Sequence, residues 1–370
     1  MRRILKRVRS LTLALAGVGY AAAGGSVPAN AWGAQGHQYT GSLGWEILNP
    51  RARSQVAALL GPNIDLGEAA VWADCLRSVS GSPGNGYRYV LEQRTPRVCR
   101  EFDDNGIEEG RITDYAARNW TNCEYSGRRA ECNLAYHFAN VNVFNRSDYR
   151  LGYHGTGPQD VVQAINAAIT VLRCGEGQTC PSPSPFSIRD KREALFLLAH
   201  FVGDVHQPLH VGAVYLDDQG REVGDEGRST TGGNNLLLVP GNTRENLHSE
   251  WDTILQSFGT APSMAAVSDA CRIAPRPDPA MERPETWATQ SVRAARAAYR
   301  GMTFVPDATQ RRYWNIRFEV ADQYARDRKA VQARQLVTAG ARLGAVLNAV
   351  WPSREPSPSC GSSTSRRTRR

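Results

Sequence analysis

The chain has 370 residues, of which 44 are Lys or Arg and 36 are Asp or Glu, so its formal net charge is +8. The positive charge lies at the two ends. Residues 1–31 hold five basic residues and no acidic one, which leaves +3, and setting aside four arginines among residues 366–370 leaves −1. A central body near neutrality excludes a protein that holds duplex DNA through a broad cationic face, because such binding needs many phosphate contacts.

The N-terminal segment has the three parts of a secretory signal peptide. Basic residues among positions 2–9 precede an apolar run at residues 11–25, and Ala29-Asn30-Ala31 fits an A-x-A cleavage pattern. We therefore expect a signal peptide at residues 1–31 and a mature chain that begins at Trp32. The mature protein is expected to be exported, either secreted or periplasmic.

The remaining sequence predicts one large domain. Residues 32–351 are enough to bury a substantial core, and residues 352–370 are expected to form a low-complexity basic tail. No later run of about 18 apolar residues predicts a transmembrane segment.

All eight cysteines follow the expected cleavage point. An even number in an exported chain predicts a disulfide framework, and no pair has the C-x-x-C spacing of a zinc or redox motif. Many pairings are open. The two bridges that short spacing favours are Cys123–Cys132 and Cys174–Cys180.

Apolar periodicity and helix-breaking residues predict a mainly α-helical chain with a small β-hairpin. In the first half, helices are expected at residues 38–60, with a break at Asn49-Pro50, and at residues 69–77 and 160–172. Residues 75–136 are polar, rich in glycine and contain four cysteines. We interpret them as an ordered, disulfide-bonded insertion.

In the second half, two short β-like runs at residues 214–216 and 236–239 flank an acidic, glycine-rich loop and predict the hairpin. Three amphipathic helices are then expected, at residues 285–300, 310–328 and 330–350.

The segment HFVGDVHQPLH, at residues 200–210, carries the first candidate site residues. The apolar run before it favours a helix, so His200 and Asp204 lie at i and i+4 on one face, where both can reach one metal ion. Pro208 ends the regular helix, which lets His210 point elsewhere. A single histidine on an apolar helix is more often a buried core residue. A second His-x-x-x-Asp pair, His248 with Asp252, favours metal binding instead.

The possible metal ligands outnumber what one ion needs. They are nitrogen and carboxylate donors without thiolate, which suit hydrolytic zinc. The set consists of the free amine and carbonyl of the new N-terminus together with histidines and aspartates: Trp32, His37, Asp74, His137, His200, Asp204, His210, His248 and Asp252. A cluster of metal ions is therefore predicted.

With these residues in place, the chain resembles the trinuclear zinc nucleases, which are the fungal single-strand-specific and plant bifunctional nucleases of the phospholipase C/nuclease superfamily. The resemblance runs from the expected N-terminus to residue 252, and more weakly to the AGARLGAVLN segment. The matching motifs are Trp32-Gly33-x-x-Gly36-His37, Trp72-Ala73-Asp74-x-x-Arg77, His137-Phe138, HFVGDVHQPLH, Gly232-Gly233-Asn234, Asn246-Leu247-His248-x-x-Trp251-Asp252 and Trp287-x-x-x-Ser291.

The resemblance implies a single-domain helical phospholipase C/nuclease-type fold and three zinc ions per chain. It implies that one zinc is held by Asp74, His137, His200 and Asp204, a second by Trp32, His37 and the bridging Asp204, and a third by His210, His248 and Asp252. Asp74, Asp204 and Arg77 are implied to be catalytic. Arg77 would also bind the substrate, together with the ring of Phe138, which can stack on a base.

Two departures from the family pattern concern the substrate. The family often has an aspartate three residues after the histidine of the His-aromatic pair, whereas this chain has Asn140, which we still expect to contact a base. The insertion at residues 75–136 is longer than in the fungal enzymes and is expected to wall or cover part of the cleft.

The expected function is hydrolysis of single-stranded DNA and RNA to 5′-phosphorylated products, with 3′-nucleotidase activity on nucleotides. We expect a monomer without a stable protein partner. One alternative is a zinc-dependent phospholipase C, but that branch has a longer spacer after the N-terminal Trp and a Glu where this chain has Asp252. The other alternative is a non-catalytic zinc-binding protein, which would need the ligands but not Arg77.

Overall fold

The structure is a computed structural model, and it describes residues 32–92, 95–102, 106–122, 132–175, 178, 180–254, 258–274 and 283–361. Within these ranges the chain is mainly helical with small sheets, which confirms the predicted fold class. The predicted signal peptide and the last nine residues of the tail lie outside the described residues. No helix in the described ranges is both long and apolar enough to cross a bilayer.

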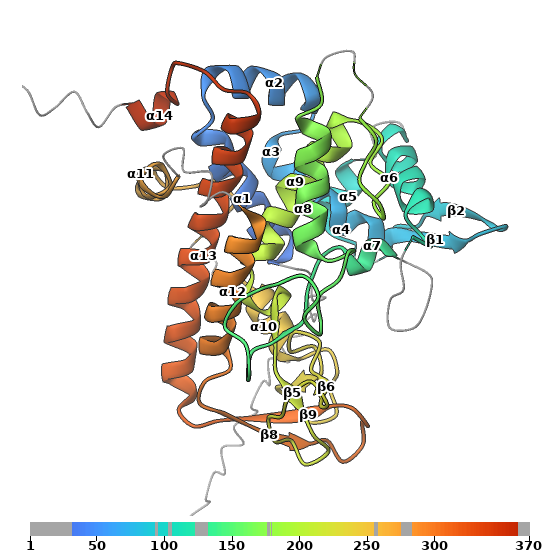
Figure 1. Ribbon diagram of the computed structural model, residues 1–370, viewed down its shortest axis with the longest axis vertical. Helices are drawn as coiled ribbons and strands as arrows, with labels where there is room; N and C mark the ends of the chain where they lie inside the picture. Colours follow the sequence, from blue (N-terminus) through green and yellow to red (C-terminus); the bar gives the residue numbers. More distant parts are fainter. Residues whose placement is uncertain are drawn as a thin grey trace, which may run out of the picture.

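Helix α9 (Lys191–His206) lies in the middle of the helical layer, between α8 (Val161–Leu172) and the N-terminal helices (Figure 1). Asp190 caps it by accepting a hydrogen bond from the Glu193 amide. Every residue from Glu193 to His206 is buried, as expected for a helix surrounded by others. Polar groups on such a helix need partners, and the site at its C-terminal end supplies them.

Helices α1 (Gly33–Glu46) and α2 (Pro50–Leu60) confirm the predicted break, because Asn49 caps α2 and Pro50 occupies its first turn. The long helix α13 (Ala321–Val350) packs closely against α1. A Cβ atom at Gly344 would lie 2.3 Å from Ile47 Cγ1, so a glycine is needed there. Helix α12 (Pro284–Ala298) runs beside α13 and donates a hydrogen bond from Ser291 to Val205 O of α9 (Figure 1).

The segment expected as one helix at residues 69–77 consists of three short pieces, α3 (Leu66–Ala69), α4 (Trp72–Cys75) and the 3₁₀ turn η1 (Leu76–Ser78). The first piece begins earlier than predicted, because Asp65 forms a capping box at its N-terminus.

The insertion is ordered wherever it is described, and it stands at one side of the molecule as a projecting hairpin beside a helix (Figure 1). Its elements are β1 (Val79–Ser82), β2 (Gly86–Tyr89), α5 (Arg97–Glu101), α6 (Ile107–Arg118) and α7 (Cys132–Ala135). A disulfide joins Cys75 to Cys99, and Arg118 of α6 pairs with Glu193 of α9 at 2.6 Å.

The predicted hairpin of residues 214–239 is wrong in its pairing. Strand β5 (Tyr215–Leu216) pairs with β6 (Arg228–Ser229) in the intervening loop, whereas β7 (Leu236–Leu237) pairs in parallel with the distant β9 (Trp314–Phe318). Strand β9 also pairs antiparallel with β8 (Met302–Pro306), and a further two-residue parallel pair joins β3 (Val141–Asn142) to β4 (Gly212–Ala213).

The prediction of a helix at residues 310–328 is also wrong for the first half of that range. Residues 314–318 are strand β9, and α13 begins only at Ala321, so it joins the second half of that prediction to the helix expected at residues 330–350. The remaining short helices are η2 (Pro208–His210), α10 (Leu247–Asp252), α11 (Met264–Ile273) and α14 (Pro358–Gly361).

Disulfides join Cys174 to Cys180, as predicted, and Cys271 to Cys360, which ties the start of the tail to α11. The predicted bridge between Cys123 and Cys132 involves a residue outside the described ranges.

Candidate metal centre

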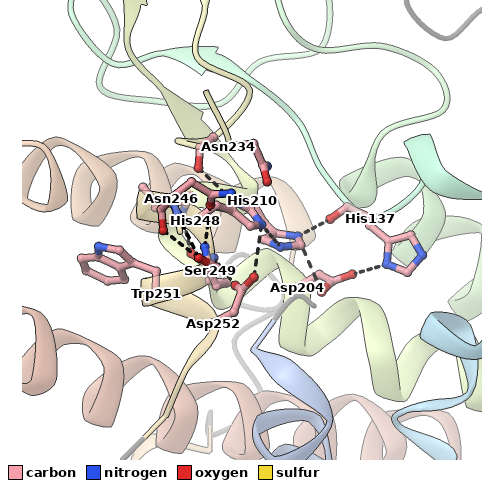
Figure 2. Close-up of polar contacts among 12 residues, drawn as sticks. His137, Asp204, His210, Asn234, Asn246, His248, Ser249, Trp251 and Asp252 are labelled. Carbon is pink, nitrogen blue, oxygen red and sulfur yellow. Dashed lines mark hydrogen bonds and ion pairs between the residues drawn. The ribbon is translucent and has the colours of Figure 1, made fainter. Parts of the chain in front are cut away.

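The carboxylate of Asp204 lies at the centre of a group of histidine rings. Its oxygens are 3.0 Å from His137 Nδ1, 3.1 Å from His200 Nε2, 3.4 Å from His37 Nε2 and 3.6 Å from His210 Nδ1. Figure 2 shows Asp204 between the rings of His137 and His210. Helix α9 supplies His200 and Asp204 one turn apart, as the i, i+4 spacing predicted.

Two groups of possible ligands share His200. One consists of His37, His200 and Asp204, and the other of Asp74, His137 and His200, with their ligand atoms within 4.8 Å of one another. The rings of His37 and His200 stack at 3.8 Å between centroids. His200 Nδ1 donates to Ala70 O, which directs Nε2 toward the centre.

A third group consists of His210, His248 and Asp252. His248 Nε2 lies 3.1 Å from His210 Nε2 and 3.5 Å from Asp252 Oδ2. The other ring nitrogen of each histidine donates to a backbone carbonyl, His210 Nδ1 to His137 O and His248 Nδ1 to Gly232 O (Figure 2). These bonds fix the tautomer and leave each Nε2 for a metal ion.

Trp32 begins the described chain beside His37. Its indole Nε1 donates to Gly203 O at 2.8 Å, and its side chain is fully buried. A Cβ atom at Gly203 would lie 2.7 Å from His37 Nδ1 and 3.8 Å from Trp32 Cδ1. The glycine of α9 therefore lets Trp32 and His37 approach the helix one turn from His200 and next to Asp204.

The donor atoms fit a metal centre, because many of them are otherwise unsatisfied. Side-chain atoms of five of these residues are buried without a hydrogen-bond partner, namely His37 Nδ1 and Nε2, Asp74 Oδ1 and Oδ2, His137 Nε2, Asp204 Oδ1 and Asp252 Oδ2. Leaving so many polar atoms unpaired costs stability unless a ligand binds them. Three carboxylates and several imidazoles without a thiolate form the donor set that zinc accepts in hydrolytic sites.

The protonation states of His137, His248 and Asp204 favour the same conclusion. Burial lowers the pKa of His137 to about 4 and that of His248 to about 3, so both rings are neutral near pH 7. Burial alone would raise the pKa of Asp204, but the charges of His200 and His210 hold it well below the usual range. Neutral imidazole and ionised carboxylate are the forms that bind a metal ion.

Asp252 differs, because burial raises its pKa well above the ordinary value. Gln207 opposes this effect by donating from Nε2 to Asp252 Oδ1 at 2.8 Å, while its Oε1 accepts from the Leu209 amide. Sequence reasoning missed Gln207, although it stands between His206 and Pro208 in the central motif.

A cavity of about 520 Å³ opens onto the centre. Arg77 lies on its wall, 37% exposed, with Nε 3.6 Å from Asp74 Oδ1. The half-buried Phe138 and Asn140 also line the cavity. The rest of its lining comes from the insertion, from the third group and from other segments near the centre: Leu76, Val79, Trp120, Asn133, Leu134, His137, Leu209, His210, Thr231, Asn234 and His248. The expectation that the insertion walls the cleft agrees with this lining.

The two remaining histidines lie apart from the centre. His206 Nδ1 donates to Val202 O, and its Nε2 lies 2.7 Å from Arg342, so it joins α9 to α13. The ring of His154 packs edge-on against Tyr215 in a turn.

Comparison with known proteins places this geometry in a family. Residues 32–352 match the family described as S1/P1 Nuclease. Endonuclease 2 from Arabidopsis thaliana is 23% identical over 349 residues, 86% of this chain and 90% of that protein. Endonuclease 4 from the same plant is 29% identical over 180 residues, 44% of this chain, so the chain spans only about half of that relative, 52% of its length. Nuclease P1 from Penicillium citrinum is 36% identical over 74 residues, 20% of this chain and 22% of that protein. Since the family match covers most of the chain, the protein belongs to the S1/P1 nuclease family.

Proposed function

We propose that this protein is an exported, zinc-dependent phosphodiesterase that hydrolyses single-stranded DNA and RNA to 5′-phosphorylated products and removes 3′-phosphates from nucleotides. The observation that carries the proposal is the buried set of unpaired imidazole and carboxylate atoms beside a cavity that Arg77 and Phe138 line. The proposal includes removal of residues 1–31 and a monomeric mature chain without a stable protein partner.

In this proposal the ligands divide into three sets that each hold one zinc ion, and Asp204, not His200, is shared between the first two sets. Asp74, His137, His200 and Asp204 hold the first, Trp32, His37 and Asp204 hold the second, and His210, His248 and Asp252 hold the third. Bound zinc supplies Lewis acidity and activates water for attack near neutral pH. The free amine of Trp32 is a ligand only if the chain begins there, so the assignment of the second ion depends on cleavage after Ala31.

The other residues bind and orient the substrate. Arg77 donates hydrogen bonds to phosphorus oxygens as negative charge develops on them. The ring of Phe138 stacks on a base, an interaction of about 1 to 3 kcal/mol with little sequence preference. Asn140 faces a base edge, where an amide both donates and accepts. Single strands suit this cavity because their bases are free to stack.

The first experiment compares substrates. The metal-loaded protein, beginning at Trp32, is incubated with single-stranded DNA and, separately, with phosphatidylcholine vesicles. We expect rapid cleavage of the DNA with 5′-phosphate ends and much slower release of phosphocholine. Turnover of the lipid alone would replace the proposal with a phospholipase C.

A second experiment separates catalysis from metal binding. Arg77→Ala should lower kcat on single-stranded DNA about a hundredfold, as loss of a charge-stabilising donor does, with the zinc content unchanged. Arg296→Ala, which removes an exposed arginine of α12, is the matched control. A wild-type protein that holds zinc but cleaves nothing would favour the non-catalytic zinc binder.

A further inference from the structure

The side chain of Asn133 has an unsatisfied amide oxygen in the wall of the candidate active site. Asn133 is only 2% exposed, and its Oδ1 is buried without a hydrogen-bond partner. It lies on α7, at the end of the insertion, and it lines the same cavity as Phe138 and Asn140.

A buried amide oxygen without a partner is costly in the free protein. A buried polar group without a partner costs about 1 to 3 kcal/mol, whereas an apolar side chain of the same shape at that place costs nothing comparable. Such a group in a folded protein calls for an explanation, and beside a cavity a bound ligand is one that supplies the missing partner. The cavity offers the place for one.

A second buried asparagine of the insertion shows what a purely structural amide looks like. Asn119 is fully buried, and its Nδ2 donates to Tyr115 O and Ser187 O. Its Oδ1 accepts from the Ser187 amide and from the Tyr136 hydroxyl. Every hydrogen-bond donor and the acceptor of this amide have partners within the protein, and the side chain joins α6 to the segment before α9.

The side chains of the cavity wall indicate which kind of ligand Asn133 would contact. Among the described residues that line the cavity none is a carboxylate, and the polar side chains besides the histidines and Arg77 are three asparagines and one threonine: Asn133, Asn140, Asn234 and Thr231. Amides match base edges, which offer donors and acceptors side by side, better than they match phosphate, which only accepts. The aromatic ring of Phe138 provides a stacking surface in the same wall.

We propose that Asn133 reads the base of the bound nucleotide, so that it is a specificity-determining residue supplied by this chain's insertion. This inference rests on the proposed nuclease function and goes beyond it. The terminal torsion of an asparagine is broad, so turning the amide toward a base edge costs little. A base bound on Phe138 then gives the amide the partner that it lacks in the free protein.

The test uses Asn133→Leu in the full mature chain loaded with zinc. Two values of kcat/KM are measured, one for dinucleoside monophosphates with each base and one for bis(p-nitrophenyl) phosphate, a diester without a base. We expect the ratio of the first to the second to fall about tenfold, which corresponds to loss of one hydrogen bond of about 1.4 kcal/mol. The differences between bases should shrink at the same time. Asn133→Asp, which only accepts while ionised, should change the order of preference toward bases that present amino groups.

Thermal unfolding separates base reading from a structural role. Asn133→Leu should melt at the wild-type temperature or higher, because it removes an unsatisfied group, whereas the control Asn119→Leu should melt several degrees lower. An unchanged substrate ratio, or a loss of stability like that of the control, would overturn the inference. If the wild type hydrolyses no nucleotide substrate, the proposed function itself is wrong, so the two failures are distinguishable.

Discussion

At the scale of single residues, Asp204 has the chemistry that a shared ligand requires. A carboxylate has two oxygens with two lone pairs each, so one side chain can bind two cations at once. Its oxygens lie within 3.6 Å of the ring nitrogens of four histidines that belong to all three groups of ligands. Removal of this charge should therefore affect more than one metal ion, whereas Asp252 belongs to one group.

Gln207 positions the third group without being a ligand. Its amide donates to Asp252 and accepts from the Leu209 backbone, so one side chain links the turn that carries His210 to the carboxylate opposite. We expect Gln207→Leu to weaken binding of one zinc ion about ten- to a hundredfold, because the buried carboxylate loses the donor that favours its ionised form.

The measurement is zinc content after dialysis against a weak chelator. We predict two zinc ions per chain for Gln207→Leu and three for the wild type. Gln163→Leu is the control, since that glutamine of α8 donates to the Tyr149 hydroxyl and, among the described residues, its side chain has no hydrogen bond to a candidate ligand. Full zinc retention by the Gln207 variant would show that its hydrogen bond does not position Asp252.

The ligand candidates could be picked out from the sequence because they come in short motifs. The spacing of His200 and Asp204 determines their common face, and the structure brings all nine candidates to one region. Gln207 and Asn133 could not be found in this way. Their roles depend on which atoms of distant segments surround the amide, and neither spacing nor residue type reports that.

At the scale of elements, the insertion is held to the central helix by ion pairs between α6 and α9. Arg118 of α6 contacts Glu193 of α9 at 2.6 Å, and Arg192 of α9 contacts Glu108 of α6 at the same distance; the two carboxylates are 3% and 6% exposed. We expect Arg118→Met to lower the free energy of unfolding by about 3 kcal/mol, because it leaves an uncompensated buried carboxylate.

Urea denaturation tests this prediction, with an exposed ion pair between an arginine and a carboxylate as the control. Arg221 lies 2.7 Å from Asp217 but is 75% exposed, so Arg221→Met should cost less than about 1 kcal/mol. Equal losses for the two variants would contradict a role of the buried pair in anchoring the insertion.

Two of the wrong predictions, the helix at residues 310–328 and the pairing of residues 236–239, concern strands that pair with a distant segment. Residues 314–318 (WNIRF) have aromatic or β-branched side chains at alternate positions, which fits a strand. The sequence after them has a helical pattern, and the predicted helix extends back from it over these residues. The strand forms because β7 and β8 lie on either side of it. Strand β5 pairs with β6 in the loop and not with β7. Strands β5 and β7 are only two residues long, so their own sequences do not determine which partner each one takes.

At the scale of the whole molecule, the candidate metal centre joins segments that are far apart in the chain. Trp32 and His37 come from the start of the described chain, Asp74 from α4, His137 from just after the insertion, and the remaining candidate ligands from α9, η2 and α10. Metal binding to such a centre stabilises the folded state of the entire domain, because the unfolded chain does not hold these donors together. The helical class could be predicted from periodicity, whereas this convergence is a property of the tertiary fold.

The central claim is that the protein holds three zinc ions in the buried groups around Asp204. Anomalous diffraction recorded at the zinc absorption edge, from crystals of the mature chain beginning at Trp32, tests it most directly. We predict three anomalous peaks per chain, two of them on either side of the Asp204 carboxylate and the third among His210, His248 and Asp252. Fewer than three peaks, or peaks away from these residues, would contradict the account.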